Sequence, residues 1–488
     1  MFAQYVQTLQ NCFKVPELRS RIFFTLALLV VCRLIALTPI PGLDGEVLTT
    51  FFDHLRKKQD TGSGEGAGGL LSMYSMFTGG ALERCAVGSL GIMPYISATI
   101  ILQLMTAVVP SLSKLSREEG GRTQIIKYGR YLTVMLCLGQ GFVMAYGWEN
   151  PSQILGAAWN DEEFVAKVSS NQLVADPGMW YNIRTCLLLT TGTVLLMWLG
   201  EQITDRGIGN GISLVITVGI IARVDQAVTG VWNMFVSSAG SLATATGDAV
   251  RAHPSKAIVL VVLLLSVVGV VIAVTQAMRK VPVQYAQRNV GRKMYQGGTT
   301  YFPLRVNYAG VMPIIFAQAI LMFPAQIFGF IGRALGPTTP SGEFIAGIGD
   351  ALNYGSFWNL AMQSLMILFF SYFWVATQFN ETQIADDLKK AGGYIPGVRP
   401  GAATRDFLHH SMSRLTLAGA VFLVVIAVIP TVMAVNFEIP FPVAQFFGGT
   451  SLLIMVGVML DTMRQVESHL AQHHYDGFLK SGKVRGRS

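Results

Sequence analysis

Two glycine-rich stretches match the spacing of nucleotide-binding loops. GEGAGG at 64 to 69 fits the GxGxxG pattern, but no strand pattern precedes it, as a dinucleotide site would require. GFLKSGKV at 477 to 484 fits the start of a phosphate-binding loop but ends in Val484, where a hydroxyl side chain is needed for magnesium. We therefore expect no nucleotide cofactor and no ATP hydrolysis in this chain.

The histidines and cysteines also lack the spacing of a metal site. His469 and His473 lie one helical turn apart, with His474 adjacent, but no third ligand of a zinc site accompanies them. The five cysteines are irregularly spaced and include no CxxC pair: Cys12, Cys32, Cys85, Cys137 and Cys186. We expect neither a metal nor a disulfide framework.

The polar residues inside the apolar segments are mostly amides. Gln103, Gln140 and Gln276 lie within such segments, and Asn307 begins another. Uncharged polar side chains can join membrane helices reversibly, whereas ion and proton pathways need intramembrane charges. Only Arg33 is a charge well inside an apolar segment, which argues against an ion-driven solute pump.

The apolar segments themselves predict a membrane protein. The sequence is 51% hydrophobic and 13% charged, against roughly 25% charged in soluble domains. A membrane helix needs about 20 apolar residues. Ten stretches are candidate spans, with the first interrupted only by Arg33: 22 to 40, 85 to 113, 131 to 148, 185 to 200, 207 to 222, 257 to 278, 306 to 332, 351 to 380, 415 to 437 and 439 to 460. The two stretches of 16 residues, 185 to 200 and 207 to 222, are short and need polar or snorkelling residues to extend them at their ends.

The distribution of charge predicts the orientation of these spans. If the amino terminus is cytoplasmic, more than two thirds of the 36 Lys and Arg residues lie on the cytoplasmic side, with fewer than half of the 28 Asp and Glu residues. This excess follows the positive-inside rule. With ten spans, we therefore predict that both termini are cytoplasmic.

Two cytoplasmic segments concentrate this positive charge. Residues 279 to 305 carry six cations and no acid, and residues 381 to 414 carry five more cations among turn-forming residues. These segments could fix topology or contact anionic lipid. They could also dock an acidic partner, such as ribosomal RNA or a cytosolic motor.

The order of the spans predicts two inverted halves. Spans one to five (1 to 222) and six to ten (257 to 462) flank an external connector at 223 to 256, and 463 to 488 form a cytoplasmic tail. Five spans in each half place the halves in opposite orientations, and such folds hold their working site between the halves.

An apolar piece at about 70 to 83 is too short to span the membrane and ends at a pair of glycines. It fits a short helix with a glycine hinge that folds back into a membrane cavity. It fits equally a surface helix that lies on the bilayer.

Several long motifs resemble the SecY family, whose members are central subunits of bacterial Sec protein translocases. The resemblance runs from end to end and follows the order of the spans. Its motifs are TPIPG at 38 to 42, FTGGAL at 77 to 82, GIMPYISATIILQL at 91 to 104, MWLGEQITDRGIGNGIS at 197 to 213, RVNYAGVMPIIFA at 305 to 317, DDLKKAGGYIPGVRPG at 386 to 401, SRLTLAGA at 413 to 420 and FGGTSLLI at 447 to 454.

The resemblance implies an all-α fold of ten helices around a pore with an aliphatic ring, a plug and a lateral gate. An apolar collar can exclude water and ions and still yield to a polypeptide. The implied positions are Ile92, Ile96, Ile212, Ile216, Ile315 and Ile454 for the ring; Leu71, Met73, Met76, Phe77, Gly79 and Gly80 for the plug; and Gln103, Gln140 and Asn307 for the gate.

The resemblance also implies a passive channel subunit in a bacterial inner membrane, with energy supplied by the SecA ATPase or the ribosome. Docking of these partners is implied for Arg279, Lys280, Arg288, Arg292, Lys293 and Arg399. The implied partners further include SecE, SecG, polypeptides that bear signal sequences, membrane lipids, and the accessory proteins SecDF, YajC and YidC. A solute transporter with inverted repeats and a non-conducting insertase are the alternatives. The external loops at 53 to 70, 149 to 182 and 333 to 358 are longer than is usual in the family.

Overall fold

The computed structural model divides the chain into two compact units. It describes residues 15–60, 74–75, 77–118, 120–151, 159, 162–165, 173–235, 254–285, 288–290, 293–295, 298–334, 339–352, 356–436, 439 and 441–481. Unit 1 comprises Met1–Trp232, Phe330–Gly342 and Ile454–Ser488, and unit 2 comprises Asn233–Gly329 and Glu343–Leu453. The division into two halves around a connector at 223 to 256 stays a prediction.

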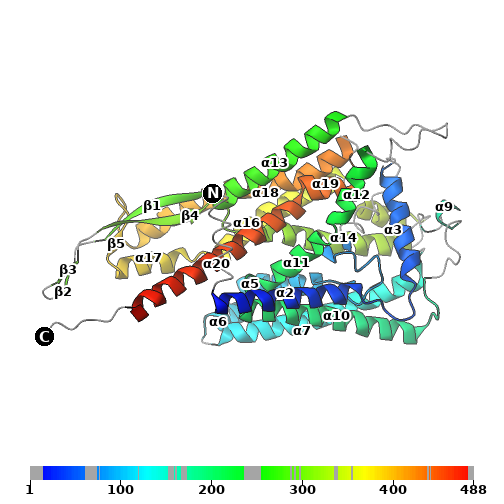
Figure 1. Cartoon of the computed structure of the whole chain (residues 1–488), viewed down its shortest axis with the longest axis horizontal. Helices are drawn as coiled ribbons and strands as arrows, with labels where there is room; N and C mark the ends of the chain where they lie inside the picture. Colours follow the sequence, from blue (N-terminus) through cyan, green and yellow to red (C-terminus); the bar gives the residue numbers. More distant parts are fainter. Residues whose placement is uncertain are drawn as a thin grey trace. The chain divides into compact units, whose positions relative to one another are not determined.

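Unit 1 is built on long apolar helices. Helices α2, α7 and α10 run side by side, and α5 packs on α7 (Figure 1). The helices of this unit are α2 (Pro16–Leu37), α3 (Gly45–Asp60), α5 (Met93–Val108), α6 (Pro110–Arg117), α7 (Gly121–Glu149), α9 (Glu162–Val165), α10 (Met179–Arg206), α11 (Gly211–Ile221), α12 (Val224–Phe235) and most of α20 (Thr450–Ser481).

Unit 2 combines apolar helices with a small sheet. Helix α16 packs on α18, and α19 packs on α13 and α18. The helices here are α13 (Pro254–Gln276), α14 (Met312–Ala334), α16 (Phe357–Gln378), α17 (Glu381–Lys390), α18 (Ala402–Asn436) and α19 (Phe441–Gly448), while α15 (Pro340–Ala351) crosses the division between the units.

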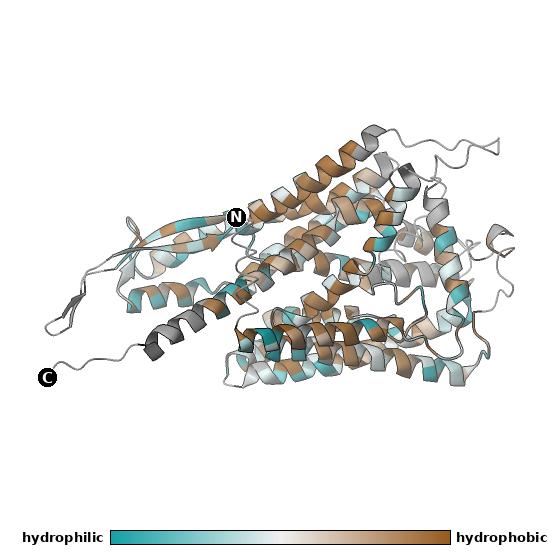
Figure 2. Cartoon of the chain, viewed as in Figure 1, coloured by the Kyte–Doolittle hydropathy of each residue, from teal (hydrophilic) through white to brown (hydrophobic). Residues whose placement is uncertain are grey.

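Every predicted apolar stretch coincides with a helix in the described residues. Within the described residues, eight helical segments are long and apolar enough to cross a membrane, and the pair α5 and α6, whose axes bend by 103°, makes a ninth when it is counted as one span. The predicted seventh span corresponds to α14, whose described apolar part is Met312–Leu321. Figure 2 shows the hydrophobic colouring along these helices. The chain is thus a multi-pass, mainly α-helical membrane protein.

Local sequence signals explain several helix boundaries. Asn210 accepts hydrogen bonds from the amides of Ile212 and Ser213 and so caps α11, while Ser356 caps α16 and Asn380 caps α17 in the same way. Proline stands in the first turn of α2, α5 and α6, where no intrahelical amide bond is lost.

The basic segment between α13 and α14 forms strands, which the sequence analysis did not predict. Strand β1 (Met278–Tyr285) pairs antiparallel with β4 (Thr299–Arg305) from Met278↔Arg305 to Gln284↔Thr299, and β5 (Gly393–Tyr394) pairs on the other edge of β1. Strands β2 (Arg288–Val290) and β3 (Lys293–Tyr295) form a second pair. The strands β1, β4 and β5 extend with α17 from one end of the unit 2 helices (Figure 1).

Helix α3 anchors a small aromatic cluster in the long loops of unit 1. The ring of Phe51 lies 5.0 Å from that of Trp159 and 5.3 Å from that of Phe164, centroid to centroid. All three side chains are almost fully buried. These loops therefore have a hydrophobic core of their own.

Candidate pore, plug and docking surfaces

Helices α5 and α11 each begin with two of the predicted ring isoleucines. Ile92 is the N-cap of α5, and the amide of Ile96 donates to its carbonyl oxygen at 3.2 Å, so the two side chains lie on one face. Ile212 and Ile216 have the same spacing in the first two turns of α11. Ile92, Ile96 and Ile216 are buried and Ile212 is partly exposed. Each helix thus carries two isoleucines, one helical turn apart, on the same face.

A close helix contact fixes the start of α11. A Cβ on Gly211 would overlap the carbonyl oxygen of Gly200 on α10, so only glycine allows this approach. The Gly211 amide donates to the Thr204 hydroxyl at 2.9 Å. The Gly209 amide donates to Oε1 of Gln465 on α20 at 2.8 Å. The isoleucine pair on α11 is therefore held against both α10 and α20.

The other two predicted ring residues are fully buried. Ile454 lies on α20 in unit 1 and is 0% exposed, and Ile315 lies on α14 in unit 2 and is 1% exposed. Five of the six isoleucines therefore belong to one compact unit. The ring as a whole stays a prediction.

The predicted plug is described from its second half onward. Leu71, Met73 and Met76 lie outside the described residues. Phe77 is buried and helical, and the chain then runs through turns, with φ +65° at Gly79 and +81° at Gly80. Such φ values favour glycine. We call residues 74–91, apart from residue 76, the plug segment.

The plug segment packs tightly on α2 and α11. A Cβ on Gly79 would lie 3.0 Å from Cα of Gly219 on α11. Nη1 of Arg33 on α2 donates to the Gly79 carbonyl oxygen at 2.6 Å. The Tyr74 hydroxyl donates to the Leu90 carbonyl oxygen at 3.2 Å. Arg33, the charge singled out inside a span, thus contacts the glycine hinge.

A buried ion pair joins the plug segment to the turn between α11 and α12. Nη2 of Arg223 lies 2.6 Å from Oε1 of Glu83, and their side chains are only 8% and 6% exposed. The Ser75 hydroxyl donates to the same carboxylate oxygen at 2.6 Å. Nε of Arg223 donates to Oε1 of Gln226 at 2.8 Å, and Nε2 of Gln226 reaches the other Glu83 oxygen at 3.5 Å.

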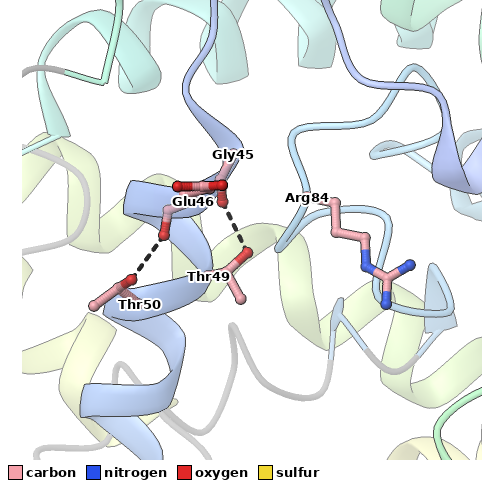
Figure 3. A pocket seen from close by; sticks show the side chains of 5 residues that line it. All are labelled: Gly45, Glu46, Thr49, Thr50 and Arg84. Atoms are coloured by element: carbon pink, nitrogen blue, oxygen red, sulfur yellow. Dashed lines mark hydrogen bonds between the residues drawn. The ribbon is translucent and has the colours of Figure 1, made fainter.

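A pocket of about 500 Å³ is lined by the first residues of α3 and by Arg84, which follows Glu83 in the chain. Figure 3 shows its lining residues, with Thr49 bonded to Gly45, Thr50 bonded to Glu46, and Arg84 across from them. The Thr49 hydroxyl also lies 3.1 Å from the Glu83 carbonyl oxygen, to which it can donate. Helix α3 therefore supports the backbone that carries Glu83.

The three predicted gate amides differ in burial. Gln103 on α5 and Gln140 on α7 are partly buried, and Asn307 before α14 is 8% exposed. Among the described residues, Oε1 of Gln103 and Nδ2 of Asn307 are buried without a hydrogen-bond partner. A buried amide without a partner costs about 1–3 kcal/mol, so these side chains can exchange partners easily.

The described part of the predicted docking surface gathers two basic loops on one sheet. Arg279 and Lys280 lie exposed on β1, and Arg399 lies exposed a few residues after β5. Because Gln284 and Tyr285 of β1 pair with Tyr394 and Gly393 of β5, the two loops are neighbours. Arg292 lies outside the described residues, and so do the side chains of Arg288 and Lys293.

An apolar layer holds this sheet in place. Val281 and Val283 of β1 point inward, alternating with exposed residues. They pack with Leu304, Phe379 and Leu408, which come from β4, the end of α16 and α18. The cations therefore stand on a rigid support.

Sequence reasoning missed the pairing of Glu83 with Arg223. The two residues are 140 positions apart, and the sequence analysis singled out neither of them. A buried position for two opposite charges cannot be read from their separate neighbourhoods. Their only sequence signal is that each borders a stretch with no other charge.

Comparison with known proteins gives a consistent relationship. The family model SecY matches residues 86–463. The chain is 38% identical to the protein translocase subunit SecY of Chlamydia muridarum over 98% of this chain and 99% of that protein. It is 37% identical to the protein of the same name from Thermotoga maritima over 99% of both chains.

Solved structures have the same fold. A structure described as a protein conducting channel superposes with a TM-score of 0.57 at 16% identity, covering 92% of this chain and 91% of that one. Sec61 from a canine ribosome-channel complex superposes with a TM-score of 0.55 at 16% identity over the same shares. From its sequence relatives, its family match and its fold, the chain belongs to the SecY family.

Proposed function

We propose that this chain is the protein-conducting channel subunit of a Sec translocase. It passes unfolded secretory polypeptides across the membrane and releases transmembrane segments sideways. The observation that carries the proposal is sequence identity of 37–38%, over nearly the full length, to protein translocase subunits of the same family. The isoleucine pairs that open α5 and α11 support it, because they provide an apolar collar on two helices of one unit.

The six isoleucines form the seal of the pore in this proposal. Branched aliphatic side chains exclude water from a narrow passage and make no specific hydrogen bonds to a passing chain. A ring of this kind can therefore admit polypeptides of any sequence. The plug segment closes the same passage at rest, in keeping with a solved SecY structure in which a plug domain is described as stabilising the closed state.

Gln103, Gln140 and Asn307 form the polar part of the lateral gate. Neutral amide bonds between membrane helices contribute about 1 kcal/mol each. A hydrophobic signal sequence that inserts between the helices offsets a cost of this size, because each buried apolar side chain contributes about 1.5–3 kcal/mol. The gate therefore opens for apolar segments and closes behind them.

The chain converts no chemical energy itself in this proposal. The SecA ATPase or the ribosome docks on the exposed cations of the β1 and β5 loops and drives the polypeptide from the cytoplasm into the channel. A ribosome-bound Sec61 complex among the structural relatives supports a ribosomal partner. SecE and SecG complete the channel, and both termini lie on the cytoplasmic side of a bacterial inner membrane, as the positive-inside bias indicates.

Site-specific crosslinking to a stalled precursor tests this function. A photoreactive residue at each ring position in turn, Ile92 and Ile315 first, should crosslink to a secretory chain halted in transit. Ile221 on α11 and Met459 on α20 are matched controls, because they are 49% and 67% exposed on ring-bearing helices. Crosslinks at the ring positions and none at the controls are expected.

Equal crosslinking at ring and control positions would contradict the pore. Depletion of the protein in cells provides an independent measurement, because precursors that bear signal sequences should then stay uncleaved inside. Saturable, ion-driven uptake of a small solute by the reconstituted chain would favour the transporter alternative.

A further inference from the structure

The Glu83–Arg223 ion pair is deeply buried. Its side chains are 6% and 8% exposed, whereas Arg130 and Glu201 form a pair at 2.9 Å with side chains 49% and 16% exposed. Burial removes both charges from water, a cost that their attraction alone barely offsets. Such a pair is therefore a poor source of net stability, and its value lies in specifying one arrangement.

The pair connects two parts of unit 1 that are distant in sequence. Glu83 belongs to the plug segment, and Arg223 stands in the turn between α11 and α12. Helix α11 also carries Ile212 and Ile216 at its start and Gly219, which contacts Gly79, near its end. The same helix thus bears two ring positions and meets the plug segment at its far end.

The supporting bonds make the arrangement specific to one position of the plug segment. Oε1 of Glu83 accepts from both Arg223 and Ser75, and Gln226 bonds to both members of the pair. If the segment moved away, Arg223 would lose its ion pair with Glu83. Breaking a buried pair is strongly unfavourable. The network therefore favours the position seen here over any displaced one.

We propose that Glu83 and Arg223 are positioning residues that hold the plug segment against α11 and α12 and so keep the channel closed at rest. The inference rests on the proposed channel function. Translocation then requires that an entering polypeptide break this pair. The strength of the pair sets how readily the channel opens without a substrate.

Resting ion leak through the reconstituted channel complex tests the proposal. Glu83→Gln removes the carboxylate charge with little change of shape, and Arg223→Gln removes its partner. Each single variant should raise the resting leak of proteoliposomes about tenfold or more, because one partner stays buried without its counter-charge. The double variant Glu83→Arg with Arg223→Glu should bring the leak back toward the wild-type level.

Glu201→Gln is the matched control, since it removes a carboxylate from an ion pair elsewhere in unit 1. Its resting leak should equal that of the wild type. A Glu83→Gln leak at the wild-type level, in a complex that still transports precursor, would overturn the proposal.

Precursor transport separates the outcomes. Single variants that leak at rest and still transport precursor support a weakened closed state. If the single variants and the double reversal all leak and all fail to transport precursor, the substitutions cause misfolding, which would contradict a positioning role. If the wild-type complex transports no precursor under any condition, the channel function itself fails, independently of this pair.

Discussion

The plug segment and the β1–β4 hairpin place charges in opposite surroundings. Glu83 and Arg223 are buried and share one set of hydrogen bonds. Arg279 and Lys280 stand exposed on a strand whose other face is apolar. Buried charges interact strongly over short distances and are little screened, whereas exposed charges act at long range and weaken with salt.

This difference assigns the two regions different tasks. A buried pair favours one internal arrangement and so can control whether the chain is open or closed. An exposed basic surface leaves the conformation unchanged and attracts anionic partners, mainly by raising their rate of association. In the proposed function, conformational control and partner recruitment are thus separated in the chain, and each should be open to change without the other.

The largest effect should be seen at Cys85, which is 0% exposed in the plug segment. Its burial keeps water-soluble reagents away from the thiol. In a variant whose other cysteines are replaced by alanine, a stalled precursor that displaces the segment should expose this thiol. The rate of labelling should then rise by about two orders of magnitude or more, because only an exposed thiol can ionise and react.

Maleimide labelling at pH 8, with and without the stalled precursor, measures this change. Glu83→Gln should raise the resting rate in proportion to its leak, and an unchanged rate with precursor bound would show that the segment does not move.

The membrane architecture could be predicted because it depends on local composition. Each apolar stretch has to satisfy its backbone hydrogen bonds within itself, so length and hydropathy are enough to place a helix. The ring positions Ile92, Ile96, Ile212 and Ile216 were instead implied by the family resemblance. The placement of the spans needed no information from distant parts of the chain.

The strands and the plug network depend on distant partners and could not be predicted in this way. Strand β1 alternates only at Val281 and Val283, and its pairing with β4 buries Leu304 from the far side of the loop. Helix α3 was missed because its charged second half resembles a solvated loop. Glu83 and Arg223 look like ordinary boundary charges until folding brings them together.

A smaller effect is expected for the exposed cations on the sheet of β1 and β5. Lys280→Glu combined with Arg399→Glu reverses two charges that β1 and β5 hold on one sheet. Exposed charge pairs contribute about 0.2–1 kcal/mol each, so affinity for the motor ATPase or the ribosome should fall about tenfold at low salt. The difference should shrink at high salt.

Equilibrium binding to membranes that contain the variant complex, at two salt concentrations, measures this loss. Membrane insertion of the subunit and its resting leak should match those of the wild type. A raised leak would mean that the hairpin also controls the closed state, which would break the separation of tasks.

The smallest effect is expected for the Arg130–Glu201 ion pair, which is more exposed than the Glu83–Arg223 pair. Nε of Arg130 donates to Oε1 of Glu201 at 3.1 Å, and Nη2 lies 2.9 Å from Oε2, a two-point contact between α7 and α10. Because half of the Arg130 side chain is exposed, solvent screens the attraction, and Glu201→Gln should lower the free energy of unfolding by less than about 1 kcal/mol. Thermal unfolding of the purified complex at low and high salt measures this loss, which should be smaller at high salt. Glu201→Gln could instead destabilise the complex as strongly as Glu83→Gln, with no salt dependence. That result would mean that hydrogen-bond geometry, and not burial, sets how much each ion pair contributes to stability.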